Sequence, residues 1–280
     1  MKKLWALQID LIKQVESICT KYGLTYYLIG GGCIGVIRHK GCIPWDDDLD
    51  IALKREDYNI FIEKAQKELK EPYFLQTPVT DPGYYRPFIK LRNNNGTSID
   101  KGNQKLAYNN GISLDIFPLD GYDDNFECRL FWKISRIKSL IAITSYNAFS
   151  ANTHTILRKI LYLCSFFVFP FGIKHFFISH NKNCTKLSKK YKNKIGIQYA
   201  HFNRNCWTWD SSLFDKVEWR PFEYTEMPIP AGYHDMLTAT YGNYMQFPPF
   251  EKRGNKHEFE IEPDIPYKEY CQHKYGVKYK

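Results

Sequence analysis

Segments of helical and strand-like pattern alternate along the first part of the sequence, and this alternation predicts a mixed fold of the α/β or α+β class. Three observations carry the prediction. Apolar residues recur at helical spacing within 4–22, a short apolar run at 25–29 ends in three glycines, and apolar residues alternate with other residues within 47–53. The first pattern indicates an amphipathic helix, and the other two indicate buried strands.

The other elements are predicted in chain order. Helices are expected at 32–40, directly after the glycines, and at about 55–70. Further strands are expected at 87–92 and at 112–117. Beyond residue 125 the chain is predicted to be helical to about residue 205. It then returns to mixed structure that is rich in aromatic residues and proline.

The composition is that of an ordinary globular protein. Hydrophobic residues make up 44% and charged residues 25% of the 280 residues, which excludes general disorder and a collagen-like structure. The net charge of +9 would suit a nucleic-acid ligand if it were spread over the molecule. Residues 129–209, however, contain 14 Lys and Arg and no Asp or Glu, so the rest of the chain carries −5. The sequence therefore describes an acidic body with a basic middle.

Cysteine usage and hydropathy bear on the compartment. The eight cysteines are scattered without a C-x-x-C pair, which favours reduced thiols in the cytosol over a zinc ribbon or a disulfide framework. Polar residues interrupt the apolar N-terminus, so no signal peptide is expected. The apolar run at 160–173 is shorter than the ~20 residues of a spanning helix. Residues 156–194 are expected either to lie on an anionic membrane surface or to form a buried helix followed by a solvated, lysine-rich loop.

A glycine turn follows the first predicted strand and formally matches G-x-G-x-x-G between Gly30 and Gly35. Asp50 lies twenty residues after Gly30, near where a dinucleotide-binding fold places its ribose-binding acid. Two features argue against such a site. The segment after the turn is short and basic, and Asp50 is not a single acid. Dinucleotide binding is therefore kept as a minor alternative.

Four carboxylates within five residues form the acidic segment, which comprises Asp46, Asp47, Asp48 and Asp50. Like charges at close range repel and raise one another's pKa, so such a group suits a divalent cation. Alternate residues of an extended strand share a face, which places Asp46, Asp48 and Asp50 on one side. Asp48 and Asp50 are then predicted to bind Mg²⁺ together with substrate phosphates. The alternatives are a solvated acidic turn and an adventitious calcium loop.

A third carboxylate is expected because a phosphoryl-transfer site must hold metal and also activate the attacking hydroxyl. Asp115 is the candidate, since it is a lone acid among the apolar residues of the strand predicted at 112–117. A charge at such a position is rarely buried without a partner. Asp120 precedes Gly121 beyond the predicted strand, where a role in a turn is expected.

These motifs resemble those of the LicD family. The resemblance rests on Gly30-Gly31, on Arg38-His39-Lys40-Gly41-Cys42-Ile43-Pro44-Trp45-Asp46-Asp47-Asp48-Leu49-Asp50-Ile51 and on Leu114-Asp115-Ile116-Phe117-Pro118-Leu119-Asp120. It covers about residues 20–120 and resumes at Phe222-Glu223 and within 227–249. The family includes bacterial phosphocholine transferases and is related to the fukutin group of polyol-phosphate transferases. The resemblance implies an α+β fold with a mixed-sheet nucleotidyltransferase core like that of DNA polymerase beta.

Carried over residue by residue, the resemblance also implies a site. It makes Asp48, Asp50 and Asp115 the metal-binding and catalytic residues, and Gly30 and Gly31 the turn that approaches phosphate. Six further residues are expected to bind substrate or nucleotide, namely Arg38, Lys40, Lys90, Arg92, Arg253 and His257. For the first four of these, a role in surface solubility is an equal alternative.

The reaction that this resemblance implies is metal-dependent, with Mg²⁺ or Mn²⁺ as cofactor. A phospho-alcohol, above all phosphocholine from CDP-choline, would be moved to a sugar hydroxyl of a cell-surface glycan or of its lipid-linked precursor. Lipopolysaccharide and teichoic acid are glycans of this kind. Nucleotidyl transfer from an NTP is the first alternative. A non-enzymatic nucleic-acid-binding protein is the second, but no base-reading motif is evident, and no nucleic-acid partner is expected.

Three parts of the chain are predicted to share this work. Residues 1–124 form the catalytic core, and 206–280 form a C-terminal part that packs back on the core. Residues 125–205 form a basic, helical middle that contacts the acceptor or an anionic membrane surface. The enzyme would accordingly work in the cytoplasm, peripherally at the inner face of the membrane.

Overall fold

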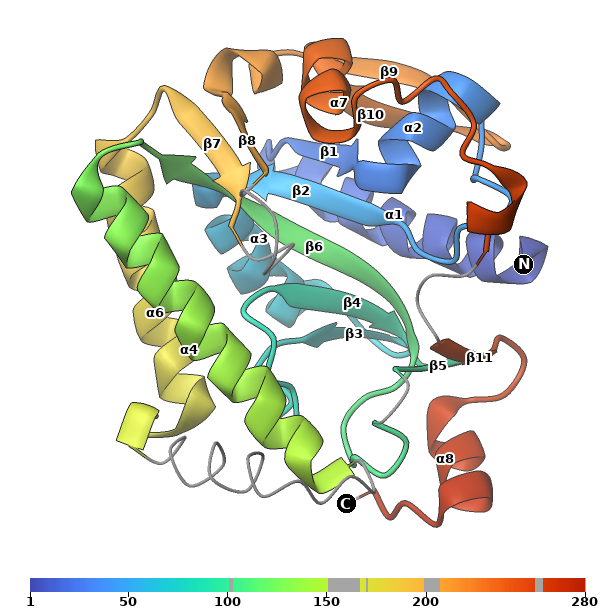
Figure 1. Cartoon of the computed structure of the whole chain (residues 1–280). Coiled ribbons are helices and arrows are strands. Elements are labelled where there is room, and N and C mark those ends of the chain that lie inside the picture. The colour runs from blue at the N-terminus through green and yellow to red at the C-terminus, as the bar shows by residue number, and fades with distance from the viewer. Residues whose placement is uncertain (101–102, 151–166, 170, 199–206, 255–258, 280) are drawn as a thin grey trace.

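The computed structural model describes residues 1–100, 103–150, 167–169, 171–198, 207–254 and 259–279. Within them the chain forms an α+β fold around a mixed, seven-stranded sheet (Figure 1). Its main path runs in the order β1 (Tyr26–Ile29), β2 (Asp50–Lys54), β6 (Ile112–Tyr122), β4 (Ile89–Asn93) and β3 (Tyr73–Gln76). The neighbours β2 and β6 are parallel, and the other pairs along this path are antiparallel.

Helices α1 (Lys2–Tyr22) and α3 (Arg55–Glu68) cover one face of this sheet, behind it in Figure 1. The apolar stripe of α1 is buried in the main core together with the inward side chains of β1, β2 and β6. Helix α2 (Gly30–His39) follows directly after β1. The helices predicted at 4–22, 32–40 and 55–70 are therefore confirmed, and so are the four predicted strands, with shifts of a few residues at their ends.

Strand β6 is longer than predicted and corrects the expectation for Asp120. It continues past residue 117 to Tyr122, where β7 (Lys194–Ile197) pairs with it. Asp120 is buried inside the strand and not in a turn. The adjacent Gly121 does not form a turn either. A Cβ at this position would lie 2.6 Å from Ser188 Cα, which belongs to a helix that packs on β6. Glycine here permits close packing, as it does where another backbone approaches a strand.

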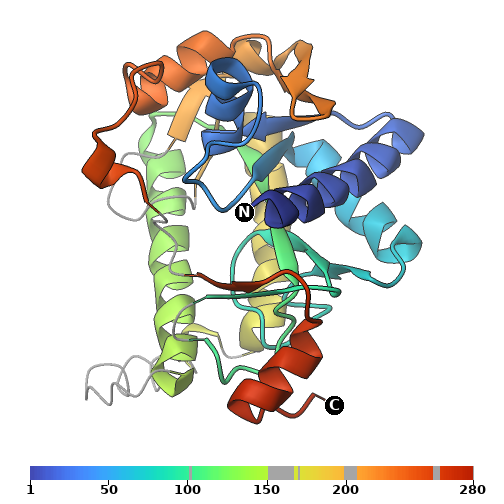
Figure 2. The same ribbon diagram turned by 90° about the vertical axis from the view of Figure 1, so that its right-hand side faces the viewer.

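The prediction that the chain is helical from 125 to about 205 is wrong at 194–197, where β7 pairs with β6 in the sheet. The rest of the described basic middle consists mainly of two long helices, α4 (Phe126–Ser150) and α6 (Gly172–Lys190). They run side by side in both views (Figure 2), and Cys128 and Trp132 of α4 pack against Cys184 and Leu187 of α6. The expectation of a solvated loop over the lysines of 181–194 is wrong, because most of this stretch belongs to α6, which buries an apolar side against α4 and β6.

The apolar run at 160–173 lies mostly outside the described residues. In its described part, Phe169 is buried, whereas Phe167 is 88% exposed and Phe171 is 77% exposed. Among the helices that the structure describes, none combines the length and the apolar character that crossing a membrane requires.

The C-terminal part contacts the core at several places. Strand β8 (Trp207–Asp210) pairs with β7, and the hairpin of β9 (Val217–Phe222) and β10 (Thr225–Pro230) packs on β1 and α2. Helix α7 (Tyr233–Tyr241) packs between α2 and β8. Strand β11 (Phe259–Glu262) pairs with β5 (Thr97–Asp100), and α8 (Tyr267–Tyr275) packs on β5. Short 3₁₀ turns lie at Ser211–Phe214 and Phe250–Lys252.

Candidate active site

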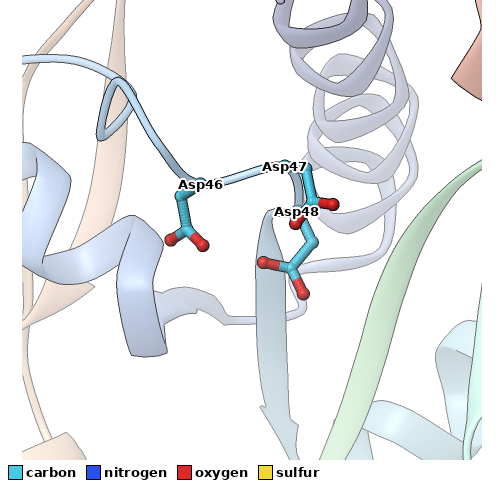
Figure 3. A group of neighbouring side chains, drawn as sticks. All are labelled: Asp46, Asp47 and Asp48. Atoms are coloured by element: carbon cyan, nitrogen blue, oxygen red, sulfur yellow. The ribbon is translucent and has the colours of Figure 1, made fainter. Parts of the chain in front are cut away.

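The acidic segment lies on the stretch that leads from α2 into β2, and α1 fixes its backbone. Trp5 Nε1 donates a hydrogen bond to the carbonyl oxygen of Asp46 (3.2 Å), and Gln8 Nε2 donates one to the carbonyl oxygen of Asp47 (3.0 Å). One carboxylate oxygen from each of Asp46, Asp47 and Asp48 lies within 4.8 Å of the other two (Figure 3). The fold thus holds together three groups that repel one another.

Burial along the acidic segment alternates as expected for an extended chain. Asp47 and Leu49 are buried, whereas Asp46, Asp48 and Asp50 are partly exposed. The strand predicted at 47–53 begins only at Asp50, where regular pairing starts. Asp46 and Asp48 therefore lie before the observed strand β2. Asp47 was not among the predicted ligands, because simple alternation assigns it to the opposite face. Its buried carboxylate nevertheless belongs to the group.

Asp50 and Asp115 are direct neighbours across the parallel pair of β2 and β6. Burial, Asp48 and Asp115 raise the pKa of the Asp50 carboxyl well above its usual range, and Lys90 opposes this shift. Lys90 lies opposite Asp115 on β4, and its Nζ is 2.7 Å from Asp115 Oδ1. The Lys90 side chain is only 4% exposed. The structure therefore brings Asp48, Asp50, Asp115 and Lys90 into one electrostatic group.

The glycine turn forms the beginning of α2 and lies against these carboxylates. Gly30 has φ +59°, and a Cβ on it would lie 3.5 Å from Asp50 Oδ2. A Cβ on Gly31 would overlap Asp46 Oδ2. No side chain therefore separates the first N–H groups of α2 from the acidic segment. This end of a helix carries partial positive charge, which offsets the carboxylates and suits a phosphate group.

Tyr241, the last residue of α7, is a site residue that the sequence did not predict. Its hydroxyl oxygen lies 3.7 Å from a Cβ placed on Gly30. Burial, Asp50 and Asp46 raise the pKa of its phenol far above the usual range. Trp207 of β8 contacts its ring edge to face, with 5.7 Å between the centroids. The one sequence signal was its place in the C-terminal segment of the LicD resemblance, since its spacing in the chain does not relate it to Asp50.

Other predicted basic residues have different surroundings. Arg92 is buried and donates hydrogen bonds to Gln76 Oε1 (2.8 Å) and to the carbonyl oxygen of Gly111 (2.7 Å). Its contacts are those of a residue that stabilises the sheet. Lys40 is exposed at the C-terminal end of α2, opposite the glycine turn. His257 lies outside the described residues.

Arg38 and Arg253 meet at the other end of α2. Arg38 donates a hydrogen bond to the carbonyl oxygen of Tyr244 (2.7 Å), and Arg253 donates one to that of Pro248 (2.7 Å). Both guanidinium carbons lie over the ring of Phe247, at 4.8 and 5.3 Å from its centroid. Burial and the charge of Arg253 lower the pKa of Arg38. These two arginines hold the C-terminal segment against α2.

The two parts of the LicD resemblance meet in space. Glu223, at the tip of the β9–β10 hairpin, accepts a hydrogen bond from the backbone N–H of Cys42 (2.8 Å), and its own N–H donates to the carbonyl oxygen of Lys40 (2.9 Å). A Cβ on Gly41 would overlap the Glu223 carboxylate. The hairpin therefore fixes the loop that leads from α2 to the acidic segment.

The side chains of this site fit a hard divalent cation. Mg²⁺ takes oxygen ligands, commonly one or two carboxylates with substrate phosphates, and a cation here would offset the repulsion that raises the Asp50 pKa. Within the described ranges, the carboxylates that meet within 4.8 Å are Asp46, Asp47 and Asp48. The predicted set is Asp48, Asp50 and Asp115, so Asp48 belongs to both. Which other carboxylates would bind the ion stays a prediction.

Comparisons with known proteins cover this region. The model of the LicD/FKTN/FKRP nucleotidyltransferase domain matches residues 23–138, which include the glycine turn, the acidic segment and β6. The lipopolysaccharide cholinephosphotransferase LicD of Haemophilus influenzae is 29% identical over 262 residues, which cover 89% of this chain and 92% of that protein. Uncharacterized proteins of Rickettsia prowazekii and Rickettsia typhi are each 43% identical over 48 residues, 17% of this chain.

Proposed function

We propose, from the premise that this chain belongs to the LicD family, that it transfers phosphocholine from CDP-choline to a sugar hydroxyl of a cell-surface glycan or its lipid-linked precursor. The named relative is a lipopolysaccharide cholinephosphotransferase, so a lipopolysaccharide is the first acceptor to test. The observation that carries the proposal is the register of Asp50 opposite Asp115, beside Lys90 and the glycine turn. This arrangement supports the proposal because it brings acids together with groups that could bind phosphate.

Asp48, Asp50 and Asp115 would hold Mg²⁺ or Mn²⁺, which when bound offsets the negative charge of the diphosphate and of the leaving CMP. The N-terminal N–H groups of α2, at Gly30 and Gly31, would bind a phosphate oxygen. Lys90 would add a second positive charge on the other side of Asp115. These groups together would position the phosphorus atom for attack.

Asp115 is the residue that we assign to the acceptor. Its carboxylate would take the proton of the attacking sugar hydroxyl as the new oxygen–phosphorus bond forms and the bond to the CMP oxygen breaks. The ion pair with Lys90 would keep this carboxylate oriented at the floor of the site. We also infer a core of the nucleotidyltransferase type, supported by the mixed sheet in which the glycine turn and the paired aspartates converge.

We place the enzyme at the cytoplasmic face of a membrane. Phe167 and Phe171, next to α6, are 88% and 77% exposed, and four lysines of 181–194 follow on α6, namely Lys182, Lys186, Lys189 and Lys190. Exposed apolar residues beside basic ones bind anionic bilayers by adding burial to charge attraction. Equal co-sedimentation with neutral and anionic vesicles at low salt would contradict this placement.

The decisive test is CMP release with Mg²⁺ from CDP-choline, CDP-glycerol and CDP-ribitol, each with lipopolysaccharide as acceptor. We expect turnover with CDP-choline, loss of turnover in EDTA and loss in Asp48→Ala. Glu63→Gln, an exposed carboxylate on α3, is the matched control and should behave like the wild type. Near wild-type CMP release by Asp48→Ala would contradict the metal-site proposal. Release of pyrophosphate from an NTP would instead identify a nucleotidyl transferase.

A further inference from the structure

A cavity lies away from the acidic segment, between α4 and the strands β7 and β8. Its volume is about 830 Å³. One wall is formed by Arg129, Lys133 and Arg136 of α4, and the other includes Lys194 and Trp209. We call this cavity the α4–β8 groove. The three residues of α4 are spaced four and three apart, so they project from one side of the helix into the same space.

The positive charge of the groove is only partly balanced by the protein. Asp124 pairs with Lys194, and Asp210 accepts hydrogen bonds from the backbone N–H and the hydroxyl of Ser212. Among the carboxylates that the structure describes, none lies within ion-pair distance of the three cations on α4. Two guanidinium groups and an ammonium facing one cavity are the chemistry that binds phosphate groups.

An apolar strip continues along the same helix from the groove. It consists of Phe126, Leu130, Ile134, Ile137 and Leu140, whose exposed fractions range from 41% to 79%. Phe126 and Leu130 also line the groove. Exposed apolar side chains in such a row mark a surface that contacts apolar material. The ligand that matches both features is an amphiphile with phosphate groups next to its lipid chains.

Strand β8 and helix α7 connect the groove to the active site. Trp209, at the groove, donates a hydrogen bond from Nε1 to Thr240 Oγ1 (3.0 Å), and the next residue of α7 is Tyr241, which faces Asp50. Trp207, two residues before Trp209 on β8, contacts the Tyr241 ring. A ligand larger than the groove could therefore extend past β8 and α7 toward the site where a phosphoryl group would be transferred.

We propose that the α4–β8 groove binds the phosphate groups of a phosphorylated glycolipid acceptor, whose lipid chains lie along the apolar strip of α4. This inference rests on the proposed function, because it gives the acceptor of that reaction its site. It predicts that recognition of the acceptor requires the phosphates of the glycolipid and the cations of α4, independently of the carboxylates that would bind the donor.

The test is direct binding, without donor and in EDTA, of bisphosphorylated lipid A and of the same lipid after dephosphorylation, both in a neutral detergent. The variant is Arg129→Gln/Lys133→Gln/Arg136→Gln. The control is Lys70→Gln/Lys216→Gln/Lys268→Gln, which removes equal charge from exposed lysines elsewhere. We expect the wild type and the control to prefer phosphorylated lipid A, and the groove variant to lose about tenfold or more in affinity for it.

Three results would overturn the inference. Equal affinity of wild type and groove variant for lipid A would show that the groove is not the site. An equal loss in both triple variants would show that only total charge matters. A loss of binding to phosphatidylglycerol vesicles with lipid A binding intact would assign the groove to the bilayer surface. Because no donor is present, these results are independent of whether CDP-choline is the substrate, which CMP release decides separately.

Discussion

Two aspartates of strand β6, Asp115 and Asp120, lie five residues apart on opposite faces of the sheet and in opposite electrostatic surroundings. Asp120 accepts hydrogen bonds from Arg55 Nε (2.6 Å) and Nη2 (2.7 Å), and both side chains are almost fully buried. Within the part of the chain that the structure describes, Asp115 lies beside Asp50 and forms its ion pair with Lys90. The first carboxylate is neutralised within the fold. The second belongs to a group in which negative charge remains in excess.

The neutralised region joins three elements. Arg55 of α3 also donates a hydrogen bond to Asn181 Oδ1 of α6 (2.9 Å), so the pair with Asp120 ties α6 to the sheet. A buried pair that is fully hydrogen-bonded in this way maintains structure, whereas unbalanced carboxylates destabilise the fold unless a ligand offsets them. This difference favours a structural role for the charges on one face of the sheet and supports the functional role proposed for those on the other.

The largest effect is expected from a substitution on the face of the sheet that carries the unbalanced carboxylates. Asp50→Asn removes one charge from the acidic group with little change in shape. We expect CMP release to fall by about 10³-fold or more, because a group that acts on developing charge is lost. The free energy of unfolding should not fall and should rise by about 1 kcal/mol, as is common when a strained functional charge is removed. Steady-state rates measure CMP release, and urea unfolding measures the free energy of unfolding. A fall in the free energy of unfolding of Asp50→Asn would contradict the contrast between the two aspartates.

The next largest effect is expected from a substitution in the buried pair of Arg55 and Asp120. Asp120→Asn leaves the Arg55 charge buried without its carboxylate, and removal of one partner of a buried pair costs about 3–5 kcal/mol. Urea unfolding should show this loss, while CMP release per folded molecule changes little. The double variant Arg55→Met/Asp120→Leu is the control and should recover much of the loss, because no unpaired charge remains. A cost below about 1 kcal/mol for Asp120→Asn would show that the pair contributes little.

The same contrast separates what the sequence could predict from what it could not. The alternation of Asp46, Asp48 and Asp50 is local, so extended geometry could predict which residues of the segment are buried, but it did not predict that the Asp47 carboxylate lies with those of Asp46 and Asp48. Asp120 was assigned to a turn because it precedes Gly121 beyond the strand predicted at 112–117. Its real partner, Arg55, is 65 residues away, and only the packing of α3 and α6 on the sheet brings the two together.

Tyr241 illustrates the same limit within the site itself. It reaches Gly30 and Asp50 because α7 packs on α2, and no local pattern encodes that contact. The fold class and the helices of the core could be predicted, since they follow from periodicity. The extension of β6 and the strand β7 within the middle predicted to be helical could not, because long-range pairing overrides local propensity there.

A smaller effect on the free energy of unfolding is expected when a divalent cation is added, because the ion should act only on the face that carries Asp115. A ligand that binds only the folded state stabilises it by RT ln(1 + [L]/Kd), about 2.7 kcal/mol at a hundredfold excess over Kd. We expect Mg²⁺ to stabilise the wild type and Asp120→Asn alike in urea unfolding, and to leave Asp48→Ala unchanged. Equal stabilisation of Asp48→Ala would mean that the ion binds without this carboxylate.

The smallest expected effect concerns His180, which stacks beneath α4 in the neutralised region, with its Nε2 3.1 Å from Cys184 Sγ. Burial, Arg55 and Lys138 lower the pKa of His180 to about 3. Between the unfolded value near 6.5 and about 3, the unfolded chain therefore binds a proton that the folded protein does not. Stability should fall with decreasing pH in this window, by up to about 1.4 kcal/mol per pH unit.

His180→Leu removes this contribution, so the test compares the pH dependence of unfolding in the variant and the wild type. From pH 7 to pH 5 the wild type should lose roughly 2 kcal/mol more than His180→Leu, whatever the variant loses in packing at neutral pH. The carboxylates titrate in both proteins and cancel in the difference. Parallel pH profiles would mean that His180 takes up its proton in the folded protein. Water would then reach the His180 ring, and the region beneath α4 and α6 would not be fully buried.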